Sequence, residues 1–118
     1  MKINNNEHLE QVLLIQWFRV QYPLLSNCLW AIPNGGMRHI RTAIRLKREG
    51  ALSGVSDLFL MIPKGNSHGA FIEMKAKKGK IQENQLKFIK LAKTMGYEGV
   101  ICYGFQEAKE FIQKYLSS

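Results

Sequence analysis

Three residues that can act as acids, bases or metal ligands lie at unusual places in apolar stretches. Asp57 opens the apolar segment 58–62, and Glu73 lies inside the otherwise apolar segment 70–74. Burying an unpaired carboxylate costs several kcal/mol, so a carboxylate in such a strand requires a neighbouring cation or metal ion. Lys75 follows two residues after Glu73, and side chains two residues apart on a strand point to the same face.

These residue types predict a particular chemistry if the two acidic strands are neighbours. Asp57 and Glu73 then form a site of hard oxygen ligands, which suits Mg²⁺ or Mn²⁺. A lysine beside such a site, here Lys75, can hold or deprotonate a water molecule, or stabilise developing negative charge. Hydrolysis of a phosphodiester bond requires this combination of groups.

Each of the three residues also has a purely structural explanation. Aspartate is common in turns, and Asp57 follows the turn-forming sequence Gly54-Val55-Ser56. An antiparallel sheet often exposes one face to water, where Glu73 and Lys75 would form a solvated pair. The presence of both acids and the lysine on two adjacent predicted strands favours the site over these explanations.

Three further polar residues lie on helices that flank the predicted strands. Gln85 falls on the apolar stripe of its helix, where an amide either caps the helix start or reaches into a site. Glu7 and Glu10 begin another helix, three residues apart and therefore on one side of it. Glu10 can supply a third acid to a metal site. The alternative is that both acids are solvated and interact with the helix macrodipole.

Positive charge is in excess and is concentrated in two segments. The 118 residues include 17 Lys and Arg against 9 Asp and Glu, a formal net charge of +8, which favours a polyanionic partner. The first segment is a predicted helix and the second follows the strand of Glu73; their candidate phosphate contacts are Arg38, Arg41, Arg45, Lys77, Lys78 and Lys80. Such runs are usually solvated faces, but two of them flanking a carboxylate site favour a groove that binds phosphates.

The turn Pro33-Asn34-Gly35-Gly36 precedes the basic helix. A glycine-rich turn can bring backbone N–H groups close to a phosphate, so Asn34 is a further candidate DNA contact. A plain connecting turn explains the same sequence.

The elements that must position these residues follow from the periodicity of the apolar side chains. In order they are helix, strand, helix, strand, strand, helix, strand and helix, with predicted ranges 7–21, 28–32, 38–49, 57–62, 70–75, 82–95, 100–103 and 108–116. The turn at 63–67 predicts an antiparallel pair of strands, and the helix at 82–95 is a candidate crossover. The fold class is therefore α/β, with a small mixed four-stranded sheet flanked by helices. On the first helix the predicted apolar stripe is Leu9, Val12, Leu13, Trp17 and Val20.

Composition narrows the class of protein. The chain is 46% hydrophobic, enough for the core of one domain over residues 1–118. Cys28 and Cys102 form no CxxC motif and fit a reducing compartment, so we expect a cytoplasmic protein. We expect no signal peptide and no membrane partner, because no apolar run is long enough for either. The three histidines lack the spacing of a zinc site.

The residues singled out above resemble the PD-(D/E)XK nuclease superfamily, whose fold is restriction-endonuclease-like. The resemblance rests on Gly54-Val55-Ser56-Asp57, Glu73-Met74-Lys75 and Gln85. More narrowly, the chain resembles the VRR-NUC domain. This closer resemblance adds the leading helix with Glu10, the turn Pro33-Asn34-Gly35, the spacing of Lys80 to Gln85, and the helix end at Gly96-Tyr97. Ser56 stands where the family usually has a proline, which shapes the backbone and takes no part in the chemistry.

The resemblance implies a role for each residue of the motif. Asp57 and Glu73 would hold Mg²⁺ or Mn²⁺, with the backbone carbonyl of Met74 as a further ligand. Lys75 would be the catalytic lysine, and Gln85 would support the site.

The resemblance also implies a helix acid, an activity and a partner. The acid would be Glu10 as a catalytic and metal-binding residue, with Glu7 as the alternative. The activity would be that of a metal-dependent DNA endonuclease acting on Holliday junctions, other branched DNA or plain duplex. The protein would be a homodimer in the cytoplasm of a bacterial cell, and its gene would belong to the bacterium or to a phage that infects it. Two other functions stay open: a non-catalytic nucleic-acid-binding module and a structural basic protein.

Overall fold

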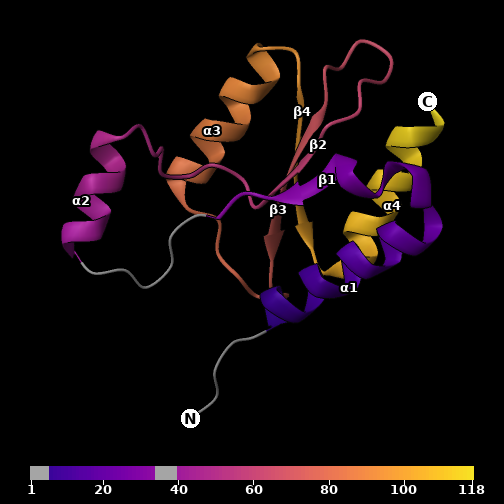
Figure 1. Ribbon diagram of the computed structural model, residues 1–118, viewed down its shortest axis with the longest axis horizontal. Helices are drawn as coiled ribbons and strands as arrows, with labels where there is room; N and C mark the ends of the chain where they lie inside the picture. The colour runs from indigo at the N-terminus through magenta and orange to yellow at the C-terminus, as the bar shows by residue number, and fades with distance from the viewer. Residues whose placement is uncertain (1–5, 34–39) are drawn as a thin grey trace.

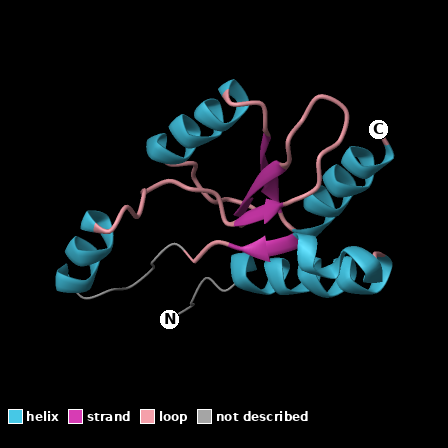
Figure 2. Ribbon diagram, turned by 45° about the horizontal axis from the view of Figure 1, so that its top comes forward, coloured by secondary structure: helices cyan, strands magenta, loops and turns pink. Residues whose placement is uncertain are grey.

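The computed structural model describes residues 6–33 and 40–118, which form a four-stranded sheet with helices on both faces (Figures 1 and 2). The order of the elements agrees with the predicted order, and a short 3₁₀ helix is added after the first α-helix. In chain order the elements are α1 (Asn6–Gln21), η1 (Pro23–Cys28), β1 (Leu29–Ala31), α2 (Ile40–Arg48), β2 (Leu58–Leu60), β3 (Ala70–Lys75), α3 (Glu83–Thr94), β4 (Glu98–Tyr103) and α4 (Phe105–Ser117).

The sheet is mixed, with the strands in the order β1-β2-β3-β4. The pair β2–β3 is antiparallel, which confirms the neighbours predicted on either side of the turn at 63–67, and β1–β2 is antiparallel too. Strands β3 and β4 are parallel and are joined through α3, as the predicted crossover requires. The fold class predicted from the sequence is therefore confirmed.

The core lies between one face of the sheet and the helices α1 and α4. Side chains alternate along β2 and β3, so every second residue points into this layer. Fully burying a Leu, Ile or Phe side chain contributes about 1.5–3 kcal/mol, so this layer is the main source of stability. Its fully buried large side chains include Leu14, Phe18, Leu58, Leu60, Ile72, Met74 and Ile112.

Helix α3 covers part of the opposite face. The ring of Phe88 on α3 contacts that of Phe71 on β3, with centroids 5.0 Å apart. Gly99 on β4 leaves room for Ile89, because a Cβ at Gly99 would lie 3.0 Å from an Ile89 methyl carbon. The face of β1 is less covered, and the side chain of Trp30 is 42% exposed.

The structure corrects the apolar stripe predicted for α1. Leu9 and Val20 are 56% and 82% exposed, whereas Leu14 and Phe18 are buried. Helix α1 carries apolar residues on two faces, and periodicity alone does not tell which of them meets the sheet. The buried row has spacing i, i+4 and continues through Glu10 towards the start of the helix. The acids of α1 therefore belong to the side that faces the protein.

Helix α2 stands apart from the sheet in both ribbon views (Figures 1 and 2). It begins at residue 40, and the predicted start at 38 and the turn 34–36 lie outside the described residues. None of the helices in the described part of the chain is long and apolar enough to cross a membrane.

Candidate active site

The register of β2 and β3 brings the two predicted acids together. Leu58 pairs with Ile72, so the next pair along the strands is Asp57 with Glu73. Directly opposed residues of antiparallel strands have Cβ atoms about 4.5–5.5 Å apart. Because Leu58 and Ile72 point into the core, alternation directs both acids to the α3 face of the sheet.

Hydrogen bonds fix the orientation of both carboxylates. The backbone N–H of Met74 donates to Asp57 Oδ2 at 2.7 Å. Gln85 Nε2 donates to Glu73 Oε2 at 3.0 Å, and Gln85 Oε1 accepts the N–H of Gln82 at 2.9 Å. Gln85 therefore does both things that the sequence left open: it closes the capping box of α3 and reaches into the site.

Gly54 brings the loop before Asp57 against the first turn of α3. Its φ of +88° lies in the left-handed region that favours glycine. A Cβ at Gly54 would also collide with the backbone oxygen of Asn84 on α3. This close approach holds the loop of Asp57 against the helix turn of Gln85. The only sign of the approach in the sequence is the glycine three residues before the aspartate.

Glu73 is almost completely buried and incompletely satisfied. Its side chain is 3% exposed, and Oε1 has no hydrogen-bond partner in the described part of the protein. Burial, and next the charge of Asp57, raise the pKa of Glu73 to about 8. Burial also raises the pKa of Asp57, although the N–H of Met74 opposes this change. The two acids together form a site that is stable with a bound proton or a bound cation.

The donor set suits a hard divalent cation. Two carboxylates on adjacent strands supply oxygen ligands, and Mg²⁺ is usually bound by one or two carboxylates with water completing its coordination. Within residues 6–33 and 40–118 no group of three or more His, Cys, Asp or Glu side chains is placed to hold a metal. This donor set fits Mg²⁺ or Mn²⁺ and lacks the four nitrogen or sulfur ligands of a structural zinc site.

Lys75 lies on the same face as Glu73 and is also buried, with 7% of its surface exposed. Its positive charge opposes part of the rise in the pKa of both acids. The ion pairs found in the described part of the chain are Arg45–Glu49 and Lys87–Glu83, so Lys75 acts on the carboxylates without a direct ion pair.

The two acids of α1 occupy different places. The carboxylate of Glu10 accepts the N–H of Phe105, the first residue of α4, and so satisfies a free donor at that helix start. Burial is the main cause of the raised pKa of Asp57 and of Glu73, and the negative charge of Glu7 adds a smaller contribution to both. Glu10, the predicted helix acid, is therefore engaged at the start of α4. The sequence signal for an inward-facing Glu10 was its spacing of four residues from Leu14 and eight from Phe18, which are both buried.

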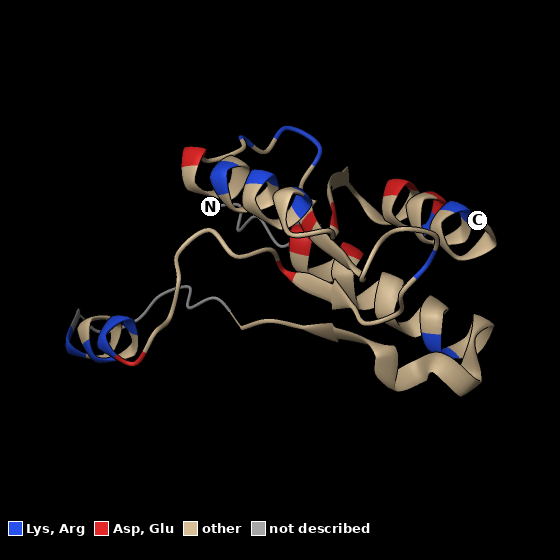
Figure 3. Cartoon of the chain, turned by 90° about the horizontal axis from the view of Figure 1, so that it is seen from above, with Lys and Arg blue, Asp and Glu red and all other residues tan. Residues whose placement is uncertain are grey.

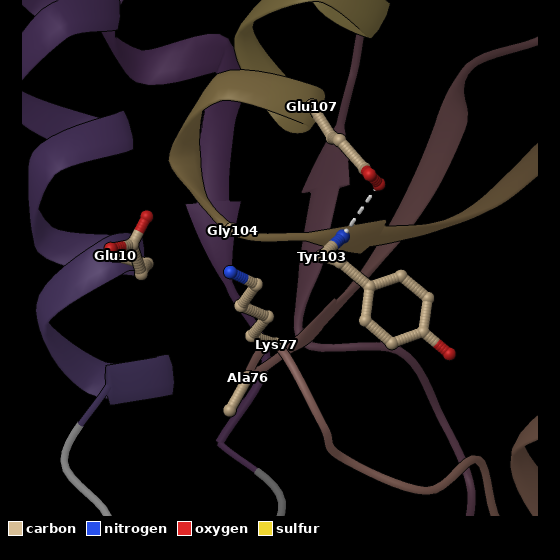
Figure 4. A pocket seen from close by; sticks show the side chains of 6 residues that line it. All are labelled: Glu10, Ala76, Lys77, Tyr103, Gly104 and Glu107. Carbon is tan, nitrogen blue, oxygen red and sulfur yellow. Dashed lines mark hydrogen bonds between the residues drawn. The ribbon is translucent and has the colours of Figure 1, made fainter.

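Glu10 also lines a pocket of about 670 Å³ at the carboxyl ends of β3 and β4. Figure 4 shows the side chain of Lys77 extending into this pocket beside Glu10, and Glu107 bonded to the N–H of Tyr103. Neither Asp57 nor Glu73 lines it. The pocket is therefore next to the carboxylate pair and separate from it.

The predicted basic contacts lie on both sides of the site. Lys77, Lys78 and Lys80 are exposed on the loop that leads from β3 to α3. Arg41 and Arg45 line a shallow hollow of about 480 Å³ on α2, and Arg45 Nε lies 3.7 Å from a carboxylate oxygen of Glu49. Figure 3 shows Lys and Arg on most of the isolated helix α2 and again along α3 and the loop before it. Asn34 and Arg38 lie outside the described residues.

Comparison with known proteins identifies the family and the fold. The sequence model of the VRR-NUC domain family matches residues 4–106. A solved structure described as a VRR-NUC domain protein superimposes with a TM-score of 0.85, at 25% sequence identity, over 99% of this chain and 92% of that chain. No curated protein matches the chain. The resemblance inferred from Asp57, Glu73, Lys75 and Gln85 is thereby confirmed at the level of the family.

Proposed function

Because this chain belongs to the VRR-NUC domain family, which is of nuclease type, we propose that it is a divalent-metal-dependent DNA endonuclease. The observation that carries the proposal is the facing pair Asp57 and Glu73, of which Glu73 is buried and has one oxygen lacking a donor among the described residues. A protein that only binds nucleic acid gains nothing from two facing acids of which one is buried, because burying a carboxylate costs free energy. A metal-dependent hydrolase requires them.

Each residue of the site has a role in this proposal. Asp57 and Glu73, with the backbone carbonyl of Met74, would hold Mg²⁺ or Mn²⁺. When bound, the cation supplies charge neutralisation at the scissile phosphate and activation of water. Gln85 holds the Glu73 carboxylate in one orientation through its bond to Oε2.

Lys75 supplies a proton donor and a positive charge on the same sheet face. Its ammonium group stabilises negative charge that develops on the phosphate oxygens, or holds the attacking water. Glu7 lies in the first turn of α1, and its negative charge acts on both carboxylates. In this proposal Glu7 is the acid that α1 contributes to the site.

We further propose that the substrate is branched DNA, such as a Holliday junction, and that the protein acts as a homodimer. The net charge of +8 and the basic residues on α2 and after β3 support a polyanionic partner. One site of this kind cuts one strand, so two sites related by a two-fold axis would cut both strands of a symmetric substrate.

A cleavage assay tests the activity. Wild type should cut a four-way junction or a matched duplex in the presence of Mg²⁺ or Mn²⁺, and EDTA should stop the reaction. Asp57→Ala and Lys75→Ala should each lower the rate by about a hundredfold or more, because they remove a ligand and a proton-transfer group. Glu110→Gln, an exposed acid on α4, is the matched control and should leave the rate unchanged.

Two outcomes would contradict the proposal in different ways. If well-folded wild type leaves both substrates uncut with either ion, the protein is not this nuclease. If wild type cleaves and both alanine variants cleave equally fast, the activity is present but the site is elsewhere.

A further inference from the structure

A row of aromatic rings crosses the sheet on the face that carries the carboxylate pair. Trp30 on β1 is opposite Phe59 on β2, and Phe59 is opposite Phe71 on β3. The ring centroids are 5.4 Å apart for the first pair and 4.6 Å for the second. Tyr97, just before β4, contacts Phe71 with centroids 5.5 Å apart. The row therefore links the outer strand β1 to the middle of the sheet.

This row lies directly beside the candidate site. Phe59 follows Asp57 by two residues and Phe71 precedes Glu73 by two, a separation of about 7 Å along each strand. The backbone N–H of Ile32, two residues after Trp30, donates to the carbonyl of Asp57 at 2.8 Å. Trp30 is thus connected to the site both through the ring row and through the β1 backbone.

The two tryptophans of the chain have different surroundings. Trp17 contacts the rings of Phe18, Tyr22 and Phe105, with Lys109 over its own ring. Trp30 contacts the ring of Phe59 and is 42% exposed on the outermost strand. The described structure therefore leaves Trp30 partly open to solvent on the sheet face that carries the carboxylate pair.

We propose that Trp30 is the platform on which an unpaired nucleobase of the DNA substrate stacks. Every nucleobase has an apolar π face that matches an indole ring, whatever its sequence. Because Trp30 is paired with Phe59, two residues from Asp57, a base stacked on Trp30 would lie on the sheet face that carries the carboxylate pair. Bases inside an intact duplex are not available for such stacking, so this contact selects DNA with opened or single-stranded nucleotides. The inference rests on the proposed nuclease function and adds to it the feature that defines the substrate.

Tryptophan fluorescence tests the contact without catalysis. In EDTA, the probes are a single-stranded oligonucleotide, a flap of the same sequence and a fully paired duplex of equal length. Trp17→Phe leaves Trp30 as the emitting residue, and its emission should be quenched by the single strand and the flap. Trp30→Phe leaves Trp17, and its emission should not change on addition of either.

Affinity and cleavage give a second measurement. Trp30→Ala should weaken binding of the single strand between about 5-fold and 150-fold, the range measured for loss of one base–aromatic stack. Its cleavage of the flap should fall while cleavage of the duplex stays within about twofold of wild type. Leu91→Ala, an exposed apolar residue on α3, is the control and should change neither.

The proposal is overturned if Trp30 emission does not respond to unpaired DNA, or if Trp30→Ala binds all three probes as wild type does. It is also overturned if Trp30→Ala converts a dimer to a monomer in sedimentation, because Trp30 then lies between two copies of the chain. Failure of the nuclease proposal looks different: wild type cuts nothing, and the fluorescence experiment still reports on stacking.

Discussion

Glu73 is 3% exposed and faces Asp57 across two strands, so burial and a second negative charge both disfavour its ionised form. Gln85 nevertheless orients the carboxylate by donating to one of its oxygens. No described group donates to the other oxygen. A residue of this kind lowers the stability of the metal-free protein at alkaline pH. The same residue becomes favourable once a cation neutralises the pair.

The stability of the metal-free protein should therefore fall as pH rises. The pKa of Glu73 is about 8 in the folded protein and near 4.5 when unfolded, so between these values the folded state holds a proton that the unfolded state has lost. The free energy of unfolding then decreases with pH, by at most about 1.4 kcal/mol per pH unit for this one proton. Urea denaturation in EDTA from about pH 5 to about pH 8 measures this slope.

Glu73→Gln isolates the contribution of Glu73 in this experiment, because glutamine keeps the bond from Gln85 and does not titrate. The variant should have a flatter slope than wild type, with a remainder from Asp57, whose pKa is also raised. Mn²⁺ should remove most of the decrease in wild type and have little effect on the variant. Equal slopes in the two proteins would show that Glu73 ionises normally.

At the residue level the sequence predicted the pair Asp57 and Glu73, because side chains alternate between the two faces of a strand and a short turn determines which residues are paired. Lys75 followed from the same alternation. The choice between Glu7 and Glu10 could not be made in this way, because the rotation of α1 depends on which of its two apolar faces packs on the sheet. Only the packing of Leu14 and Phe18 settles that rotation.

At the level of elements, α3 connects the fold to the site. Its first turn is capped through Gln85, contacts the loop at Gly54, and holds Glu73, so the same residues stabilise the helix start and orient the site. Helix α3 and the crossover were predictable because apolar periodicity and a glycine stop mark them. The 3₁₀ helix after Pro23 was not predicted, because its apolar residues carry no period that distinguishes it from a loop.

Helix α2 is the element on which a DNA-binding prediction can be made. Its basic residues project from a helix that stands apart from the sheet (Figure 1), a placement typical of an arm that reaches along a phosphate backbone. The double substitution Arg41→Ala/Arg45→Ala should weaken DNA binding and reduce the slope of log K against log salt by about 2, one for each phosphate that the variant no longer neutralises. Fluorescence anisotropy at several salt concentrations measures both quantities.

Arg19→Ala/Lys114→Ala removes the same charge from exposed positions on α1 and α4, and it serves as the control for the arm. It should leave the salt slope close to that of wild type. If both double variants reduce the slope equally, α2 contributes net charge without a specific contact. That result would remove α2 from the DNA-binding surface.

At the scale of the whole molecule, the exposed apolar surface of α1 bears on assembly. The exposed apolar side chains of α1 are spaced so that they lie on one side of the helix. The apolar surface continues onto η1. Exposed apolar patches mark interaction sites, and in a two-fold dimer the same patch of both copies forms the interface. The stripe consists of Leu9, Leu13, Val20 and Leu24, which are 56%, 48%, 82% and 98% exposed.

If this stripe forms the interface of the proposed homodimer, charge placed on it should prevent assembly. Wild type should sediment at twice the chain mass of 13.6 kDa, and Leu13→Glu/Val20→Glu should sediment as a monomer. Leu91→Glu, at an apolar position on α3 that is as exposed as Leu13, should remain dimeric. A monomeric wild type at micromolar concentration would contradict the homodimer, whereas a dimeric double variant would move the interface away from α1. If wild type is a dimer, the monomeric variant should still nick one strand, because each carboxylate pair is complete within one chain. The variant should no longer make paired cuts across a junction.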